Sequence, residues 1–249
     1  MKVDDIKLIG VMGGGVMGGG IAQSCIVAGF HVSIRDLNGE LNEKTRETMI
    51  EGRFGLRGAV ERGKLTQEQL DEALGNLSFT TNVEDLRDAD LIIEAVPEDR
   101  ELKKKVFAEL DSAIKPEAVF ATNTSGFAIS DLNEAVSRKA QFIGMHFFSP
   151  AFVMRLIEII YAPETSEDTI KLLEDVGEKI RKETVRVKDA PNAYGFVANR
   201  IYFAAVAEAR KVMDEEIASV DDINKAMRFG FNWPAGPLEM VAGARKGWQ

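Results

Sequence analysis

Residues 6–22 read IKLIGVMGGGVMGGGIA, a short apolar run followed by six glycines within eight residues. The run from Ile6 to Met12 predicts a buried strand, and the stretch from Ile21 to Ala28 predicts a helix. Between them, residues 13–18 fit the pattern G-x-G-x-x-G. Because glycine-rich turns are common, the pattern alone is equally consistent with a permissive turn that binds nothing.

The surroundings of this loop favour a dinucleotide-binding site. The loop follows a predicted strand, opens a predicted helix and precedes a second predicted strand at 31–36, whose last residue lies 18 residues beyond Gly18. In a loop of this kind, Gly13 permits the sharp turn, Gly15 lets the backbone approach a pyrophosphate, and Gly18 lets the helix pack closely on the strand.

The predicted dinucleotide is NAD. Val16 and Met17, within the loop, are candidate cofactor contacts, and the helix that follows has free N–H groups and a positive dipole end that favour bound phosphates. The carboxylate of Asp36 would accept hydrogen bonds from both hydroxyls of an adenosine ribose and would repel a 2′-phosphate, which favours NAD over NADP. The neighbouring Arg35 weakens that preference.

Most of the chain alternates between short apolar runs and longer stretches with helical spacing. This alternation predicts an α/β fold, a Rossmann-type doubly wound and mainly parallel sheet. We expect the NAD-binding domain to span 1–190, with a polar helical hairpin inserted at 38–77, and a short all-helical segment to span 191–249. Further strands are expected at 91–96, 118–122, 141–147, 156–161 and 184–187, and further helices at 100–114, 129–136, 166–181, 196–213 and 220–228.

The composition excludes several classes of function. The 249 residues include 40 acidic and 31 basic side chains, and the net charge of −9 disfavours nucleic acid and anionic membranes as partners. With Cys25 as the single cysteine and only two histidines, we expect no disulfide framework and no cysteine- or histidine-rich metal site. The acidic N-terminus lacks the pattern of a secretory signal, and no apolar run approaches about 20 residues, so we expect a cytoplasmic protein.

A histidine and a glutamate lie 12 residues apart in two predicted strands. His146 stands in GMHFFSP (144–150), and Glu158 stands in the apolar stretch LIEII (156–160). A carboxylate inside such a strand is costly unless it has a partner, and an imidazole is a suitable one. The acid would then fix the tautomer of the ring, and the other ring nitrogen would act as a general base. A lone histidine in an apolar run is otherwise more often a core residue.

Two further polar segments are candidates for binding substrate or cofactor. The segment TNTSG (122–126) follows an apolar run, and it is equally consistent with a strand-to-helix turn capped by hydroxyls. Asn199 and Arg200 begin a predicted helix, where they are equally consistent with ordinary surface polarity.

Taken in order, these segments resemble the 3-hydroxyacyl-CoA dehydrogenase family, including its short-chain 3-hydroxybutyryl-CoA members. The resemblance runs from about Lys7 to Met240. It is carried by Gly13-x-Gly15-x-Met17-Gly18-x-Gly20-Ile21-Ala22, Asn123-Thr124-Ser125, His146-Phe147-Phe148-x-Pro150, Met154-x-Leu156-x-Glu158 and Asn199-Arg200.

The resemblance implies NAD-dependent, reversible oxidation of an (S)-3-hydroxyacyl-CoA to the 3-oxoacyl-CoA. His146 would remove the 3-hydroxyl proton while hydride passes from C3 to C4 of the nicotinamide, and Glu158 would hold the base and compensate its charge. Ser125 would bind the reacting oxygen, and Asn199 would orient the acyl-CoA. The resemblance also places two residues near the cofactor, Glu94 and Asn123.

The polar stretch 38–77 resembles the helical hairpin that contacts CoA in this family. Arg57, Arg62 and Lys64 are therefore candidate contacts for the CoA phosphates, although a charged helix is usually only a solvated face. Lys103 and Lys104 occur where the family has lysines, and we expect them on a solvated helix face.

Three features depart from the family pattern. Ser149 stands where the family has an asparagine, and residues 192–194 lengthen a hinge at which the family passes directly from proline to glycine. The chain ends at 243–249, whereas the family's helical domain, through which it forms homodimers, normally continues. We therefore expect either a fragment of a longer or fused enzyme or a genuine shortening.

Two other functions stay open. A dehydrogenase of a sugar acid or polyol would share the glycine loop and the histidine, but the pair Phe147-Phe148 and the segment Met154-x-Leu156 are more similar to the acyl-CoA branch. A dinucleotide-binding protein without turnover would not need the set formed by Ser125, His146, Glu158 and Asn199.

Overall fold

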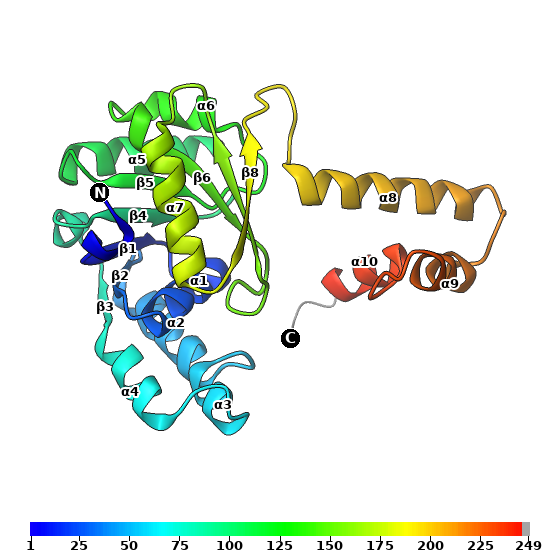
Figure 1. Ribbon diagram of the computed structural model, residues 1–249, viewed down its shortest axis with the longest axis horizontal. Helices are drawn as coiled ribbons and strands as arrows, with labels where there is room; N and C mark the ends of the chain where they lie inside the picture. The colour runs from blue at the N-terminus through cyan, green and yellow to red at the C-terminus, as the bar shows by residue number, and fades with distance from the viewer. Residues whose placement is uncertain (246–249) are drawn as a thin grey trace. The chain divides into compact units, whose positions relative to one another are not determined.

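The computed structural model describes residues 1–245, which form two compact units divided between Tyr194 and Gly195 (Figure 1). The division lies a few residues after the boundary expected at 190. Of the final segment 243–249, on which the expectation of a shortened end rests, residues 246–249 lie outside the described residues.

The first unit is built on one eight-stranded sheet with the order β3-β2-β1-β4-β5-β6-β7-β8. The chain winds outward from β1 in both directions, and all neighbouring strands are parallel except β6 and β7. This topology confirms the predicted doubly wound, mainly parallel sheet. The strands are β1 (Leu8–Met12), β2 (His31–Arg35), β3 (Leu77–Thr80), β4 (Leu91–Glu94), β5 (Val119–Thr122), β6 (Phe142–Phe147), β7 (Leu156–Tyr161) and β8 (Glu183–Lys188).

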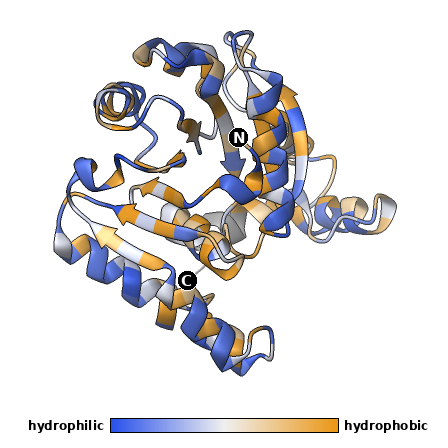
Figure 2. Ribbon diagram, turned by 60° about the vertical axis from the view of Figure 1, so that its left-hand side comes forward, coloured by the Kyte–Doolittle hydropathy of each residue, from blue (hydrophilic) through white to orange (hydrophobic). Residues whose placement is uncertain are grey.

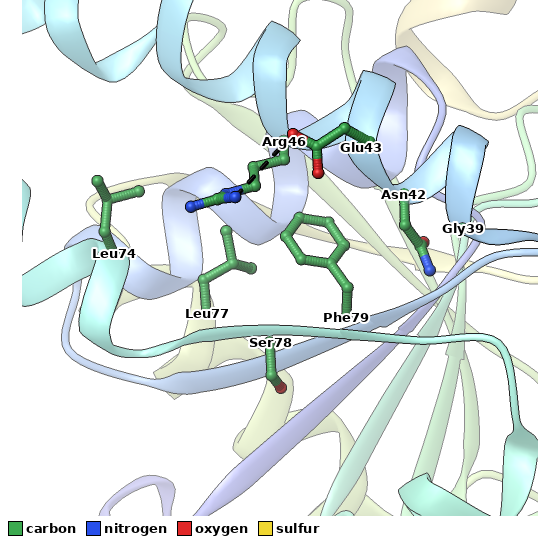
Figure 3. Close-up of a pocket in the computed structure, with 8 residues that line it drawn as sticks. All are labelled: Gly39, Asn42, Glu43, Arg46, Leu74, Leu77, Ser78 and Phe79. Carbon is green, nitrogen blue, oxygen red and sulfur yellow. Dashed lines mark ion pairs between the residues drawn. The ribbon is translucent and has the colours of Figure 1, made fainter.

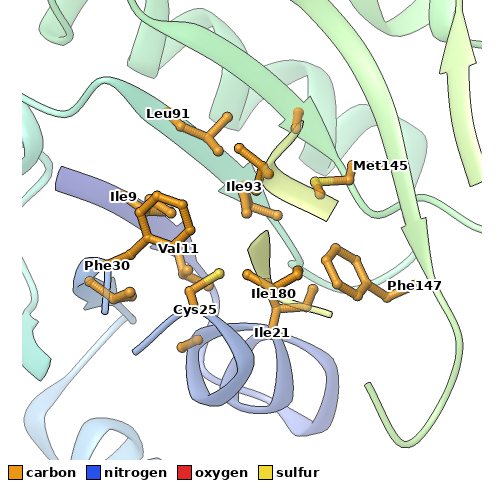
Figure 4. Packing of buried hydrophobic residues seen from close by; sticks show 14 of the residues in the cluster. Ile9, Val11, Ile21, Cys25, Phe30, Leu91, Ile93, Met145, Phe147 and Ile180 are labelled. Atoms are coloured by element: carbon orange, nitrogen blue, oxygen red, sulfur yellow. The ribbon is translucent and has the colours of Figure 1, made fainter. Parts of the chain in front are cut away.

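Helices cover both faces of this sheet, and their apolar residues alternate with polar ones (Figure 2). On one face, Ile21 of α1 lies in a hydrophobic cluster with Ile9 and Val11 of β1 (Figure 4). On the other, the rings of Phe107 in α5 and Phe142 in β6 lie 4.7 Å apart. Strand side chains alternate between the two faces, so both layers are held by the same strands. The helices are α1 (Val16–Val27), α5 (Arg100–Ala113), α6 (Ile129–Leu132) and α7 (Glu167–Lys179).

Three helices, where a hairpin was expected, lie between β2 and β3: α2 (Gly39–Glu51), α3 (Leu56–Glu61) and α4 (Gln67–Gly75). The side chain of Asn38 caps α2 by accepting a hydrogen bond from Leu41 N–H at 3.0 Å. The helix α4 leads into the edge strand β3, which the prediction misses because its four residues, LSFT, form no apolar run.

The second unit contains α8 (Val197–Asp214), α9 (Val220–Gly230) and α10 (Pro237–Arg245). The first two coincide with predicted helices, and α10 was not predicted. Its first turn depends on Asn224 of α9, whose buried side-chain oxygen accepts a hydrogen bond from Leu238 N–H at 3.1 Å. A tertiary contact of this kind leaves no local sequence pattern.

Candidate active site

The loop between β1 and α1 forms a turn that requires glycine at two positions. Gly13 has φ = +91°, in the left-handed region that other residues rarely adopt. A Cβ atom on Gly18 would lie 1.8 Å from the carbonyl oxygen of Gly13. The start of α1 therefore packs against the loop at a distance that any side chain at position 18 would prevent.

The same loop leaves the N-terminus of α1 open. A Cβ atom on the N-cap residue, Gly15, would have no neighbour within 4 Å, and Val16 is 75% exposed. The first N–H groups of a helix have no partners within the helix, so the loop presents donors around an open space. Helix α1 begins at Val16, five residues before the expected start at Ile21, so Val16 and Met17 are its first two residues, and the loop fits a pyrophosphate.

Asp36 is held beside this loop at the end of β2. Its Oδ2 accepts a hydrogen bond from Gly14 N–H at 2.7 Å, and its Oδ1 accepts one from Leu37 N–H at 2.7 Å. Each carboxylate oxygen has more than one lone pair, so both can also accept a hydrogen bond from a ribose hydroxyl. The loop and Asp36 together fit the predicted NAD.

His146 and Glu158 face each other across the antiparallel strands β6 and β7. The imidazole Nδ1 lies 2.8 Å from Oε2 of the carboxylate, and the two side chains are 4% and 0% exposed. A buried carboxylate at this distance orients the ring through Nδ1. The 12-residue spacing in the sequence thus corresponds to a direct cross-strand pair.

The carboxyl ends of the parallel strands gather polar groups at one edge of the sheet. Glu94 and Thr122 are partners in register at the ends of β4 and β5, and Asn123 follows directly. The side-chain oxygen of Asn123 accepts a hydrogen bond from the N–H of Phe147 at 2.8 Å, next to His146. Asn123 therefore fixes the end of β6, and its predicted cofactor contact stays a prediction.

Ser125 lies in the turn after β5, and Glu98 fixes that turn. Oε1 of Glu98 accepts hydrogen bonds from Ser125 N–H at 2.8 Å and from the hydroxyl of Thr124 at 2.7 Å. Glu98 belongs to none of the predicted site segments. Its signal was the position of an acidic residue just after a predicted strand, at the edge where open α/β sheets bind ligands.

Lys103 is buried, which corrects the expectation of a solvated helix face. Its side chain is 1% exposed, and its Nζ lies 2.6 Å from Oε1 of Glu94 and 3.3 Å from Oε2 of Glu98. The spacing of Lys103 from Phe107 and Leu110 places all three on the inner face of α5. That spacing was the available signal for a buried lysine.

Glu94 makes its hydrogen bonds inside the protein, and its predicted cofactor contact stays a prediction. Its carboxylate is fully buried, with Oε1 accepting hydrogen bonds from Lys103 and from Val96 N–H, and Oε2 from the hydroxyl of Thr122 at 2.6 Å. Burial raises the pKa of Glu94, although the Lys103 ammonium and the hydrogen bonds oppose this rise. Glu94 therefore supports Lys103 and the ends of the two strands.

The remaining basic candidates differ in exposure. Lys104 is partly buried, and its Nζ lies 2.8 Å from Oδ1 of Asp131, so it too departs from the expected solvated face. Arg57, Arg62 and Lys64 lie on α3 or shortly after it and are exposed, where a phosphate could reach them.

The structure places two further predicted residues without testing their roles. Asn199 lies in the first turn of α8, in the second unit, and its contact with the substrate stays a prediction. Ser149, which replaces the family's asparagine, is exposed in the loop between β6 and β7.

A pocket of about 300 Å³ lies apart from these residues, between α2 and β3 (Figure 3). It holds an ion pair between Arg46 and Glu43 at 4.0 Å, and none of the predicted site residues lines it.

Within residues 1–245, no group of three or more His, Cys, Asp or Glu side chains is arranged to hold a metal ion. Among the helices in the described part of the chain, none is long and apolar enough to cross a membrane.

Comparison with known proteins agrees with this geometry. A family model described as the NAD-binding domain of 3-hydroxyacyl-CoA dehydrogenase matches residues 8–190, and the model of its C-terminal domain matches residues 195–244. The chain is 38% identical to a probable 3-hydroxybutyryl-CoA dehydrogenase of Deinococcus radiodurans, over 93% of this chain and 81% of that protein. It is 37% identical to the 3-hydroxybutyryl-CoA dehydrogenase of Clostridioides difficile, over 93% of this chain and 80% of the other.

The fold comparison gives the same result. The crystal structure of (S)-3-hydroxybutyryl-CoA dehydrogenase from Ralstonia eutropha matches with a TM-score of 0.89 and 36% identity, covering 94% of this chain and 81% of that one. The two domain matches and these relatives span nearly the whole chain, glycine loop and buried histidine–glutamate pair included. The chain therefore belongs to the 3-hydroxyacyl-CoA dehydrogenase family and contains its NAD-binding domain.

Proposed function

We propose that this protein catalyses the reversible, NAD-dependent oxidation of (S)-3-hydroxyacyl-CoA to 3-oxoacyl-CoA, with His146 as the general base. The observation that carries the proposal is the buried cross-strand contact of 2.8 Å between Nδ1 of His146 and Oε2 of Glu158. The names of the relatives support the substrate class, because several are 3-hydroxybutyryl-CoA dehydrogenases.

The proton step follows from the orientation of the imidazole. With Nδ1–H donated to Glu158, the lone pair of Nε2 accepts the proton of the 3-hydroxyl group. The ring then carries a positive charge, and the buried carboxylate of Glu158 stabilises it without itself taking up the proton. The pair therefore serves as a base in oxidation and as an acid in the reverse reaction.

Other residues bind and orient the reactants. Bound NAD would supply the acceptor for the hydride from C3 of the substrate. In the proposal, the open N-terminus of α1 holds the pyrophosphate and Asp36 holds the adenosine ribose. Ser125 donates a hydrogen bond to the reacting oxygen, and Glu98 keeps its backbone in place.

The proposal extends to three regions that contact the rest of the substrate or a second copy of the chain. Asn199 orients the acyl-CoA, and exposed Arg57, Arg62 and Lys64 bind the CoA phosphates. The C-terminal helices form a homodimer. This last part is consistent with apolar side chains that α8 and α9 leave exposed, among them Ile201 and Phe229, and size-exclusion chromatography with light scattering would test it.

The substrate class is tested by following NADH oxidation at 340 nm. We expect turnover with acetoacetyl-CoA, and a series of longer 3-oxoacyl-CoA substrates would give the preferred chain length. A sugar acid or polyol, assayed in parallel with NAD⁺, should not be oxidised. Turnover of the sugar acid with none of acetoacetyl-CoA would contradict the proposal, and NADH binding without any turnover would indicate a non-catalytic protein.

A further inference from the structure

The loop between β6 and β7 joins the two strands that carry the proposed base and its partner. It runs from Phe148 to Arg155, so His146 precedes it and Glu158 follows it. Within the loop, the N–H groups of Val153 and Met154 both donate to the carbonyl oxygen of Pro150, each at 2.9 Å. These bonds close a compact turn, whose position depends on what holds it from outside.

A single lysine side chain holds this turn. Lys182 lies between α7 and β8, far from the loop in sequence, and is 9% exposed. Its Nζ donates hydrogen bonds to the carbonyl oxygens of Ala151 at 2.8 Å, Phe152 at 3.2 Å and Met154 at 2.7 Å. An ammonium group has three N–H donors, so these three carbonyls use all of them.

The backbone at Lys182 is itself held by hydrogen bonds. The backbone N–H of Lys182 donates to the carbonyl oxygen of Gly177 at 2.9 Å, which closes the end of α7. The next residue, Glu183, donates its N–H to the carbonyl oxygen of Arg155 at 2.7 Å, at the far end of the loop. The side chain of Lys182 therefore extends from the end of α7, and the far end of the loop is hydrogen-bonded to the neighbouring residue, Glu183.

The loop also lies directly against the helix that begins at the glycine loop. A Cβ atom on Gly20 of α1 would lie 3.1 Å from Cβ of Ala151 and 3.5 Å from the backbone nitrogen of Phe152. Ala151 is 1% exposed. The turn held by Lys182 thus sits between the catalytic strands and the helix proposed to bind the pyrophosphate.

We propose that Lys182 is a positioning residue. Its ammonium group fixes the turn 150–154 and thereby fixes the position of the His146–Glu158 pair relative to the cofactor-binding helix α1. This role rests on the proposed function. Hydride and proton transfer need the base and the cofactor in a defined geometry, and a displacement of about 1 Å can cost roughly a hundredfold in rate.

The charge state of the cluster is consistent with this role. Burial lowers the pKa of Lys182 to about 8, and Cys25, the titratable group that faces it from α1, opposes this shift. Burial raises the pKa of the Cys25 thiol to about 12, so the thiol is neutral at pH 7. The lysine is mostly protonated at pH 7, and an ammonium makes stronger hydrogen bonds to carbonyl oxygens than a neutral amine.

Lys182→Met tests the role, because methionine has a similar length and volume but no donor. We expect kcat for acetoacetyl-CoA reduction to fall roughly 10- to 100-fold per folded molecule, while the affinity for NADH changes less than fivefold. Lys182→Arg, which keeps charged donors, should recover a large part of kcat. Lys171→Met, on the exposed surface of α7, is the matched control and should resemble wild type.

A second measurement, hydrogen–deuterium exchange, reports on the loop itself. The amides of Val153 and Met154, which bond to Pro150, should exchange hydrogen for deuterium faster in Lys182→Met than in wild type, as followed by mass spectrometry of peptides covering 148–156. If Lys182→Met does not fold, the comparison uses Lys182→Gln, which keeps two donors but no charge, against Lys182→Arg. The expected order of kcat is wild type, Arg, Gln.

Three results would overturn the role of Lys182. They are a kcat of Lys182→Met within twofold of wild type, a loss of activity that only follows the loss of folded protein, and unchanged exchange in the loop. A wild-type enzyme that turns over no acyl-CoA would overturn the proposed function instead. In that case the exchange measurement still decides whether Lys182 holds the turn.

Discussion

The close packing of Gly18 against the carbonyl oxygen of Gly13 in the cofactor loop gives the most specific structural prediction. In Gly18→Ala, the new Cβ atom would lie 1.8 Å from the carbonyl oxygen of Gly13, whereas real Cβ contacts essentially never fall under 3.0 Å. The start of α1 and the loop must therefore separate by about 1.2 Å. Overpacking of this kind costs about 1–3 kcal/mol, and each 1.4 kcal/mol lost from binding weakens it tenfold. We expect the Kd for NADH to rise roughly 10- to 100-fold.

The neighbouring Gly19→Ala is the matched control. Its Cβ atom would meet Thr45 at 3.4 Å, an ordinary contact, so this variant should bind NADH normally. It should also be more stable by up to about 1 kcal/mol, because alanine favours a helix interior. Fluorescence titration with NADH and thermal unfolding of both variants make the comparison. Normal NADH affinity and stability in Gly18→Ala would refute the account of the loop.

Three further predictions concern charged side chains. Lys103→Met should lower the free energy of unfolding, measured in urea, by about 3–5 kcal/mol, because it leaves the carboxylate of Glu94 buried without its partner. The double variant with Glu94→Gln should recover part of this loss. No recovery would argue against the ion pair. Asp36→Ala should reduce the ratio of kcat/KM for NAD⁺ to that for NADP⁺, and an unchanged ratio would refute its ribose contact. Although burial raises the pKa of Asp90, hydrogen bonds from Lys115 and two backbone N–H groups lower it overall. Its stabilising contribution is therefore present above about pH 4 and is lost as the pH falls through the lowered pKa. Asp90→Asn should be less stable than wild type at pH 7, and the difference should shrink as the pH falls through that lowered pKa. A difference that does not change with pH would contradict this.

The sheet was predictable because its central strands are continuous apolar runs separated by glycine or polar turns. The edge strand β3 was not, because LSFT at 77–80 is short and half exposed, and its pairing with β2 comes from tertiary structure. The same holds for α10, whose start depends on the side chain of Asn224 in another helix. Local patterns are strong where one face is fully buried and weak at the edges of the fold.

The cross-strand contact of His146 and Glu158 was predictable because a carboxylate in an apolar strand needs a partner, and few residues could supply one. The expectation for Lys103 was wrong because its charge favours a solvated face, whereas its spacing from Phe107 and Leu110 places it on the inner face of α5. Lys182 had no signal, since its three partners are backbone carbonyls of a loop about 30 residues away in sequence. Contacts between a side chain and a distant backbone require coordinates.

The central claim is that His146, oriented by Glu158, moves the substrate proton. The most direct test compares turnover of acetoacetyl-CoA with NADH affinity in His146→Ala. The account predicts that kcat falls by about 10²- to 10⁴-fold, as for the loss of a general base, while the Kd for NADH stays within threefold of wild type. Turnover close to wild type, or an equal loss of turnover and NADH affinity, would contradict it.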